Sequence, residues 1–113
     1  MVSVTVVLDG KGLLRHCQVW GHAGAGQPGN DVVCAALSVL SRTALRMLAE
    51  RADVSVQGDA PERGNLWFSV NLREEGARPF LEALTTFLLE GFRSVSQEYP
   101  AYCTLHIQTE GRL

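Results

Sequence analysis

The sequence predicts an α+β domain in which two helices pack on one face of a sheet of about five strands. Three observations support this fold class. Alternating apolar residues mark several strands, two long stretches without Gly-rich breaks mark helices, and the elements follow in the order ββαββαβ. For such an order, a two-layer sandwich with a mixed or mostly antiparallel sheet is the economical arrangement. The pattern leaves the order of the strands in the sheet open.

Length and composition place the chain among ordinary globular proteins. At 113 residues it can build one core, so we expect residues 1–113 to form a single domain. The net charge of −2 offers no basic surface to a nucleic acid. The chain does not begin like a signal peptide, and no apolar run approaches the roughly 20 residues that cross a bilayer. With three cysteines and no close Cys spacing, we expect a cytoplasmic protein without a membrane partner.

A hairpin is expected at the start of the chain. Alternation over residues 2–8 predicts the first strand, and Asp9-Gly10 is a strong signal for a hairpin turn. The return strand should cover about residues 13–21. Its two faces are not cleanly apolar and polar, so the sequence does not tell which one is buried. One face carries Leu13, Arg15, Cys17 and Val19, and the other carries Leu14, His16, Gln18 and Trp20.

A long apolar helix follows a glycine-rich loop. Asn30 or Asp31 is a good N-cap, and we expect the helix to run from Val32 to about Glu50. Its apolar residues cover more than one stripe, which indicates burial on more than one side. In so small a domain, a partner subunit could cover the second side.

The second half repeats the pattern of strands followed by a helix. A short strand is expected around Val54 and Val56, a polar turn at 58–65, and a cleaner strand at 66–72. Pro79 suits the first turn of a second helix that ends near Gln97, and a last strand covers 103–108. The expected apolar stripe of this helix consists of Phe80, Ala83, Leu84, Phe87, Leu88, Gly91 and Phe92. The polar face opposite consists of Glu82, Thr85, Thr86 and Glu90.

The stretch from Gly21 to Ser38 carries the candidate chemistry. If Asp31 is the N-cap, Cys34 is the third helical residue, and its sulfur lies among N–H groups without intrahelical partners. Such a setting lowers a thiol pKa from its free value of roughly 8.5, and the N–H groups could donate to an oxyanion. His22 would be the base that deprotonates the thiol. Ser38, on the same helical face as Cys34, could fix a water or a neighbour behind the sulfur.

Other interpretations of these residues remain open. A cysteine within Val-Val-Cys-Ala-Ala is usually a small core residue, and His22 could cap or line a surface groove. Asp31 either orients His22 or caps the helix, and its position favours the cap. No second Cys or His is spaced closely enough to predict a metal site.

Three further groups of residues have simpler expectations. Cys17 and Cys103 lie in strands, where structural burial is expected. His16 and His106 are flanked by polar residues and should be exposed. Trp20 and Trp67 are expected to pack in the core or at an interface, and walls of a substrate groove are the alternative.

The motif resembles the signature of a known family. The residues are Gly21-His22-Ala23-Gly24, then Gly29, then Asp31-Val32-Val33-Cys34-Ala35-Ala36 with Ser38. This pattern is similar to that of the ribosomal-processing cysteine protease family called Prp, and the likeness spans essentially the whole chain.

The resemblance implies a function and a set of site residues. Cys34 matches the family nucleophile, His22 its base, and Asp31 and Ser38 positions of supporting role. Members are small bacterial dimers that work without a cofactor. They remove a short N-terminal extension from a large-subunit ribosomal protein, number twenty-seven. The loop that closes over the substrate matches Gly21, Ala23, Gly24, Gly26 and Gly29.

The chain departs from the family pattern in this loop. Between Gly24 and Gly29 the family commonly has an aromatic residue, an acidic residue and a second aromatic residue. This chain has Ala25-Gly26-Gln27-Pro28, which bears on substrate preference more than on catalysis. The alternative function is therefore a non-catalytic dimeric binding module acting on a ribosomal or ribosome-assembly partner.

Overall fold

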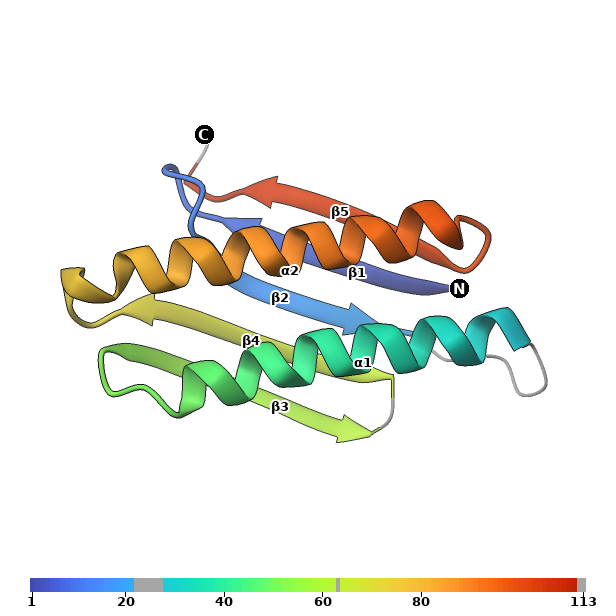
Figure 1. Cartoon of the computed structure of the whole chain (residues 1–113), viewed down its shortest axis with the longest axis horizontal. Coiled ribbons are helices and arrows are strands. Elements are labelled where there is room, and N and C mark those ends of the chain that lie inside the picture. The colour runs from blue at the N-terminus through green and yellow to red at the C-terminus, as the bar shows by residue number, and fades with distance from the viewer. Residues whose placement is uncertain (22–27, 63, 112–113) are drawn as a thin grey trace.

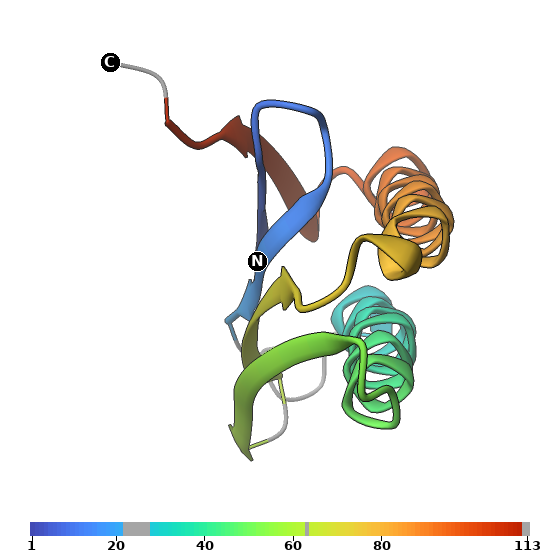
Figure 2. The ribbon, with the colours of Figure 1, turned by 90° about the vertical axis from the view of Figure 1, so that its left-hand side faces the viewer.

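The protein consists of one layer of strands and one layer of helices. Its structure is a computed structural model that describes residues 1–21, 28–62 and 64–111, with the backbone alone for residues 28–31 and 62. Within these ranges, both long helices cover the same face of the sheet (Figure 1). Figure 2 shows the two layers edge-on, with no described helix on the other face. The predicted α+β class is confirmed.

The sheet is mixed and has five strands. They are β1 (Val2–Leu8), β2 (Leu14–Trp20), β3 (Val54–Glu62), β4 (Asn65–Leu72) and β5 (Cys103–Thr109). Their order across the sheet is β3-β4-β2-β1-β5. β1 pairs parallel with β5, and the other neighbours are antiparallel. The helices are α1 (Pro28–Ala49), α2 (Arg78–Glu98) and a short 3₁₀ helix η1 (Glu75–Ala77).

A bulge in β2 explains why its pattern was ambiguous. Val7 pairs with His16 and Leu8 with Leu14, so Arg15 has no opposing residue on β1. The extra residue turns Leu14 onto the face that also carries Cys17, and both side chains are fully buried. The faces expected from strict alternation are therefore wrong for Leu14. The preceding turn is as predicted, with Asp9 Oδ1 accepting the N–H groups of Lys11 and Leu13 at 2.8 and 2.9 Å.

Helix α1 begins four residues before the predicted start. Pro28 is its first residue, which makes Asp31 the fourth. The expectation that Asn30 or Asp31 caps the helix is therefore wrong. Proline suits the first helical position because its missing N–H would have no intrahelical partner there.

Helix α1 is also more apolar than we expect from the sequence pattern. By length and composition, the window Val32–Ala49 could cross a membrane, with a mean hydropathy of 1.6. In the fold this helix packs on the sheet and buries Val33, Leu37 and Leu48 completely. Core helices pass the same test of length and composition.

Strand β3 is longer than expected. It continues through residues 58–62, where we predicted a polar turn, and ends just before Arg63 and Gly64. Pro61 fits because β3 is an edge strand, where a residue without an N–H need not break the ladder. The neighbouring strand β4 has the predicted alternation, with Leu66, Phe68 and Val70 buried.

The buried face of α2 differs in part from the predicted stripe. It consists of Leu81, Leu84, Thr85, Leu88, Phe92 and Val95. Thr85, placed on the polar face by the sequence analysis, is buried; its hydroxyl donates to Leu81 O at 2.7 Å and accepts the Leu14 N–H at 3.1 Å. Phe87, placed in the stripe, is 70% exposed. Residues 81, 84, 88, 92 and 95 follow the helical period, and Phe87 lies beside this line rather than on it.

Candidate active site

Three segments meet where β2 ends. Trp20 is the last residue of β2, and Gly21 leads from it towards His22. The Gly21 N–H donates to Asn65 Oδ1 at 3.2 Å. The start of β1 lies alongside, since Ser3 pairs with Trp20. Helix α1 begins at this same end of the sheet (Figure 1).

The close approach of these segments requires glycine at two positions. Gly21 has a φ of +127°, and a Cβ there would lie 2.6 Å from the Met1 carbonyl oxygen. Gly64, with a φ of +88°, would place a Cβ 2.8 Å from the Gly21 carbonyl oxygen. Both clashes involve backbone atoms, and L-residues rarely adopt either conformation. The β3–β4 turn and the first residue of the chain therefore enclose Gly21.

Cys34 lies in the second turn of α1. It is the seventh helical residue, so the expectation that it is the third is wrong. Its own N–H belongs to the intrahelical ladder, and the unpaired N–H groups lie one turn earlier. Because the influence of the helix dipole falls off within the first turn, the helix start alone gives weaker support for a reactive thiol. The side chain is 5% exposed and belongs to the hydrophobic core.

The structure describes only some of the predicted site residues. His22, Ala23, Gly24 and Gly26 lie outside the described residues, so the pairing of Cys34 with His22 stays a prediction. Gly29 and Asp31 lie in the first turn of α1, where the backbone alone is described. Ser38 lies one turn after Cys34 and is half-buried.

The other two cysteines are buried, as expected. Cys17 is fully buried at the centre of the sheet, and burial raises the pKa of its thiol to about 12. Burial also raises the pKa of Cys103. Both thiols are therefore protonated at neutral pH, which suits a structural role.

The histidines and tryptophans lie differently from expectation. His16 is half-buried rather than free in solvent: its Nδ1 lies 2.8 Å from Ser69 Oγ, and its ring stacks on Trp67 with 6.1 Å between centroids. His106 is exposed, as predicted. Trp20 and Trp67 are exposed, so core packing is wrong for both.

Sequence reasoning missed the buried polar side chains. In the described ranges these are Ser41, Asn65 and Thr85. Ser41 donates to Leu37 O at 2.7 Å, a local bond that any helical serine can make. Asn65 was assigned to a polar turn, and nothing in its sequence neighbours signals burial. Among the same described residues, no three His, Cys, Asp or Glu side chains form a group that could hold a metal ion.

Solved structures share this fold over nearly the whole chain. The protein SMU.848 from Streptococcus mutans is 31% identical, with a TM-score of 0.73 over 97% of this chain and 96% of that chain. The essential ribosomal processing protease Prp from Staphylococcus aureus, in complex with a substrate peptide, has a TM-score of 0.77. It is 16% identical, over 96% of this chain and 100% of that chain, so this likeness concerns the fold. No curated protein sequence matches the chain.

A family model defines the class of protein. The model of the cysteine protease Prp matches residues 1–104. The chain therefore belongs to the cysteine protease Prp family. The enzyme class predicted from the Gly21–Ser38 motif is confirmed.

Proposed function

We propose that this protease uses Cys34 as its nucleophile and His22 as its general base and acid. The observation that carries the proposal is the placement of Cys34 on α1, whose start lies at the sheet end where Gly21 leads into His22 (Figure 1). Both residues stand at matching positions of the family motif. Since Cys34 lies beyond the first turn, the imidazole rather than the helix start has the main part in activating the thiol.

The proposed reaction has two steps. The Cys34 thiol gives its proton to His22 as Sγ attacks the peptide carbonyl carbon, and unpaired N–H groups of the first turn of α1 stabilise the oxyanion. His22 then protonates the leaving amine, and the C–N bond breaks to leave a thioester on Cys34. Water attacks the thioester with His22 again as base, which releases the carboxylic acid and restores the thiol. Asp31 and Ser38 have supporting roles beside this pair.

The proposed substrate is the N-terminal extension of a large-subunit ribosomal protein, number twenty-seven, cleaved after an apolar residue. The ribosomal processing role named for the Staphylococcus aureus relative supports this assignment. We place the reaction in the cytoplasm, where ribosomal proteins are made. The small side chains of Ala25-Gly26-Gln27-Pro28 offer an extended apolar peptide fewer contacts than the aromatic residues common in the family.

The mechanism is tested with a peptide copied from the extension of that ribosomal protein in the source organism. Cys34→Ala should bind the peptide without cutting it, and His22→Ala should cut it very slowly. Cys103→Ala is the matched control, because it removes another buried thiol and should keep its activity. Peptide mass measurement follows the cleavage. Undiminished cleavage by Cys34→Ala would rule out the mechanism.

The substrate is tested separately from the mechanism. Intact-mass measurement of the ribosomal protein, with and without the enzyme, should show loss of the extension. A ribosomal protein that already begins at its mature end would exclude this substrate. Binding without cleavage by the unaltered chain would favour the alternative function, a binding module for a ribosomal or assembly partner.

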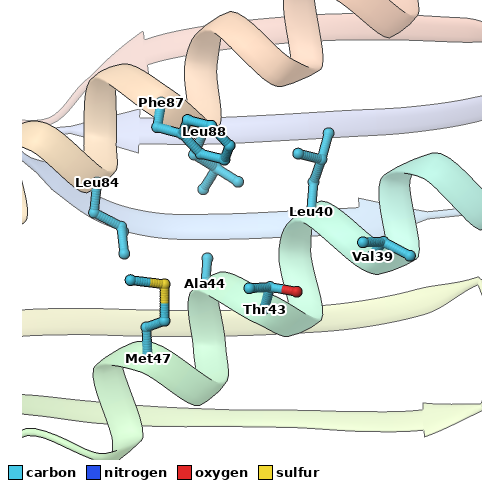
Figure 3. Close-up of a pocket in the computed structure, with 8 residues that line it drawn as sticks. All are labelled: Val39, Leu40, Thr43, Ala44, Met47, Leu84, Phe87 and Leu88. Carbon is cyan, nitrogen blue, oxygen red and sulfur yellow. The ribbon is translucent and has the colours of Figure 1, made fainter.

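We further propose that the protein acts as a homodimer through its helix layer. A groove of about 180 Å³ between α1 and α2 has a lining that is apolar except for Thr43. The lining residues come from both helices (Figure 3): Val39, Leu40, Thr43, Ala44, Met47, Leu84, Phe87 and Leu88. Val39, Met47 and Phe87 are exposed, and such contiguous apolar surface is typical of subunit interfaces. A second copy related by a two-fold axis would cover both grooves.

A further inference from the structure

Asn65 is a buried polar residue at the candidate active site. Its side chain is 5% exposed, and its Oδ1 accepts the Gly21 N–H at 3.2 Å. The bond joins the start of β4 to the residue just after β2, 44 positions apart in the sequence. Gly21 and Asn65 are not paired in the β2–β4 ladder, whose last pair is Val19 with Leu66. The side chain of Asn65 therefore extends the connection between the strands beyond their ladder.

The backbone around Gly21 is fixed on its other sides as well. Its Cα lies so close to the Met1 carbonyl oxygen that no Cβ would fit, and its carbonyl oxygen lies against Gly64. Asn65 adds the only directional contact that the structure gives for the Gly21 N–H within the described chain. Together these contacts set the direction in which the chain leaves Gly21, and His22 is the next residue.

We infer that Asn65 is a positioning residue for the protease reaction and acts through Gly21 on His22. The inference rests on the proposed role of His22 as the base. An imidazole is an effective base only when held in a narrow range of positions, and a displacement of about 1 Å can cost roughly 100-fold in rate. Loss of the Asn65 carboxamide frees the peptide that precedes His22, without removing any group that reacts.

Thr85 provides a matched control. It is also buried, and it also accepts a backbone N–H of the β2 segment, that of Leu14 at 3.1 Å. Leu14 begins β2, whereas Gly21 follows its end, so the two bonds hold opposite ends of one strand. Thr85→Val leaves the buried Leu14 N–H without this acceptor, and Asn65→Ala does the same to the part-buried Gly21 N–H, so both variants should destabilise the fold. Only Asn65→Ala changes the strand end next to His22.

The test compares the unaltered enzyme with Asn65→Ala, Thr85→Val and His22→Ala. The first readout is the rate at which iodoacetamide alkylates Cys34, identified by peptide mass, at pH 7 and at pH 9.5. A positioned base speeds the reaction mainly at pH 7, because a thiol ionises without help in alkaline solution. The second readout is kcat and KM on the ribosomal-extension peptide. Thermal melting shows that each variant is folded, and Asn65→Ser replaces Asn65→Ala if the alanine variant is not.

The inference predicts a specific pattern. The pH 7 to pH 9.5 ratio of alkylation rates falls in Asn65→Ala towards that of His22→Ala and is unchanged in Thr85→Val. For Asn65→Ala, kcat falls about 10- to 100-fold with little change in KM, as expected when an interaction matters only in the transition state.

Two other outcomes separate the inference from the proposed function. The inference alone is overturned if Asn65→Ala keeps the alkylation-rate ratio and the kcat of the unaltered enzyme while His22→Ala loses both. The proposed function, and the inference with it, is overturned if Cys34 of the unaltered enzyme does not react with iodoacetamide. The same holds if His22→Ala leaves the pH 7 to pH 9.5 ratio of alkylation rates unchanged.

Discussion

Cys17 shows how strongly a single buried thiol ties stability to pH. It lies between Val6 of β1 and Phe68 of β4 at the centre of the sheet, and burial raises the pKa of its thiol to about 12. The unfolded chain loses this proton near pH 9. Between these two pH values the native state binds more protons than the unfolded state, so stability must fall as pH rises.

We therefore predict an alkaline loss of stability that depends on Cys17. Above pH 9, the free energy of unfolding should fall by up to about 1.4 kcal/mol per pH unit because of this thiol. Cys17→Ala should be less stable at pH 7 because it leaves a small cavity. Above pH 9, however, its free energy of unfolding should fall less steeply with pH than that of the unaltered protein. Urea titrations of both proteins at pH 8, 9, 10 and 11 measure the difference. If the free energy of unfolding falls equally steeply with pH in both proteins, ionisation of Cys17 does not contribute to the alkaline loss of stability.

The sequence predicts Cys34 and His22 as a reactive pair, which stays a prediction, but it does not predict the residues around them. Cys34 and His22 stand in a local motif, and a local pattern is readable along the chain. Asn65 gains its role from contact with Gly21, which depends on how the β3–β4 hairpin meets β2. The burial of Thr85 likewise depends on the bulge in β2, which presents the Leu14 N–H to α2.

Among the elements, the β3–β4 hairpin depends on one close approach. A Cβ at Gly58 would lie 2.7 Å from both the Phe68 Cβ and the Trp67 carbonyl oxygen. These atoms belong to the backbone and to the first atom of a core side chain, so they cannot move aside easily. In the β3–β4 ladder, Gly58 lies directly opposite the buried Phe68.

Gly58→Ala should therefore destabilise the protein. We expect a loss of about 1–3 kcal/mol, the usual cost of forcing a methyl group into a packed site. Gly76→Ala is the control, since a Cβ there meets nothing within 4 Å. Urea denaturation of the two variants measures the loss. Equal stability of Gly58→Ala and the unaltered protein would mean that β3 shifts away from β4 at low cost.

The elements were predicted with uneven success for physical reasons. β4 and β1 alternate in burial over most of their length because one face meets the helices and the other does not, so their pattern was readable. β3 was cut short because Gly58, Asp59 and Pro61 are turn residues by composition, although an edge strand tolerates them. The start of α1 was misplaced because a capping rule applied to Asn30 and Asp31 overlooked Pro28 as a first helical residue.

For the whole molecule, two faces could form the interface of the proposed dimer. The helix layer exposes Phe87 beside an apolar groove, and the opposite face of the sheet exposes Trp20 and Trp67. Each face has exposed large apolar side chains, so the two can be distinguished by placing one charge on each.

We predict that Phe87→Glu separates the dimer into monomers, because it places a charge in the proposed interface. Trp20→Glu, on the other face of the sheet, should leave the dimer intact. Light scattering after gel filtration at micromolar concentration measures both masses. A monomeric Trp20→Glu with a dimeric Phe87→Glu would instead assign the interface to the sheet. A monomeric unaltered protein would contradict the dimer itself.

The topology as a whole was beyond sequence reasoning. The order β3-β4-β2-β1-β5 places the last strand of the chain parallel to the first. That pairing joins segments about a hundred residues apart, as in the partners Val2 and Cys103, and no local pattern encodes it. The layer arrangement could be predicted because it follows from the number and order of elements alone.

The contact between Met1 and Gly21 has a practical consequence for making the protein. Residues fused ahead of Met1 would emerge beside the end of β2, where the Met1 carbonyl already lies against Gly21. The end of β5, where Thr109 pairs with Leu8, lies at the opposite end of the sheet (Figure 1). An affinity tag or a fluorescent fusion is therefore better placed at the C-terminal end, because an N-terminal one would crowd Gly21, which leads into the proposed base His22.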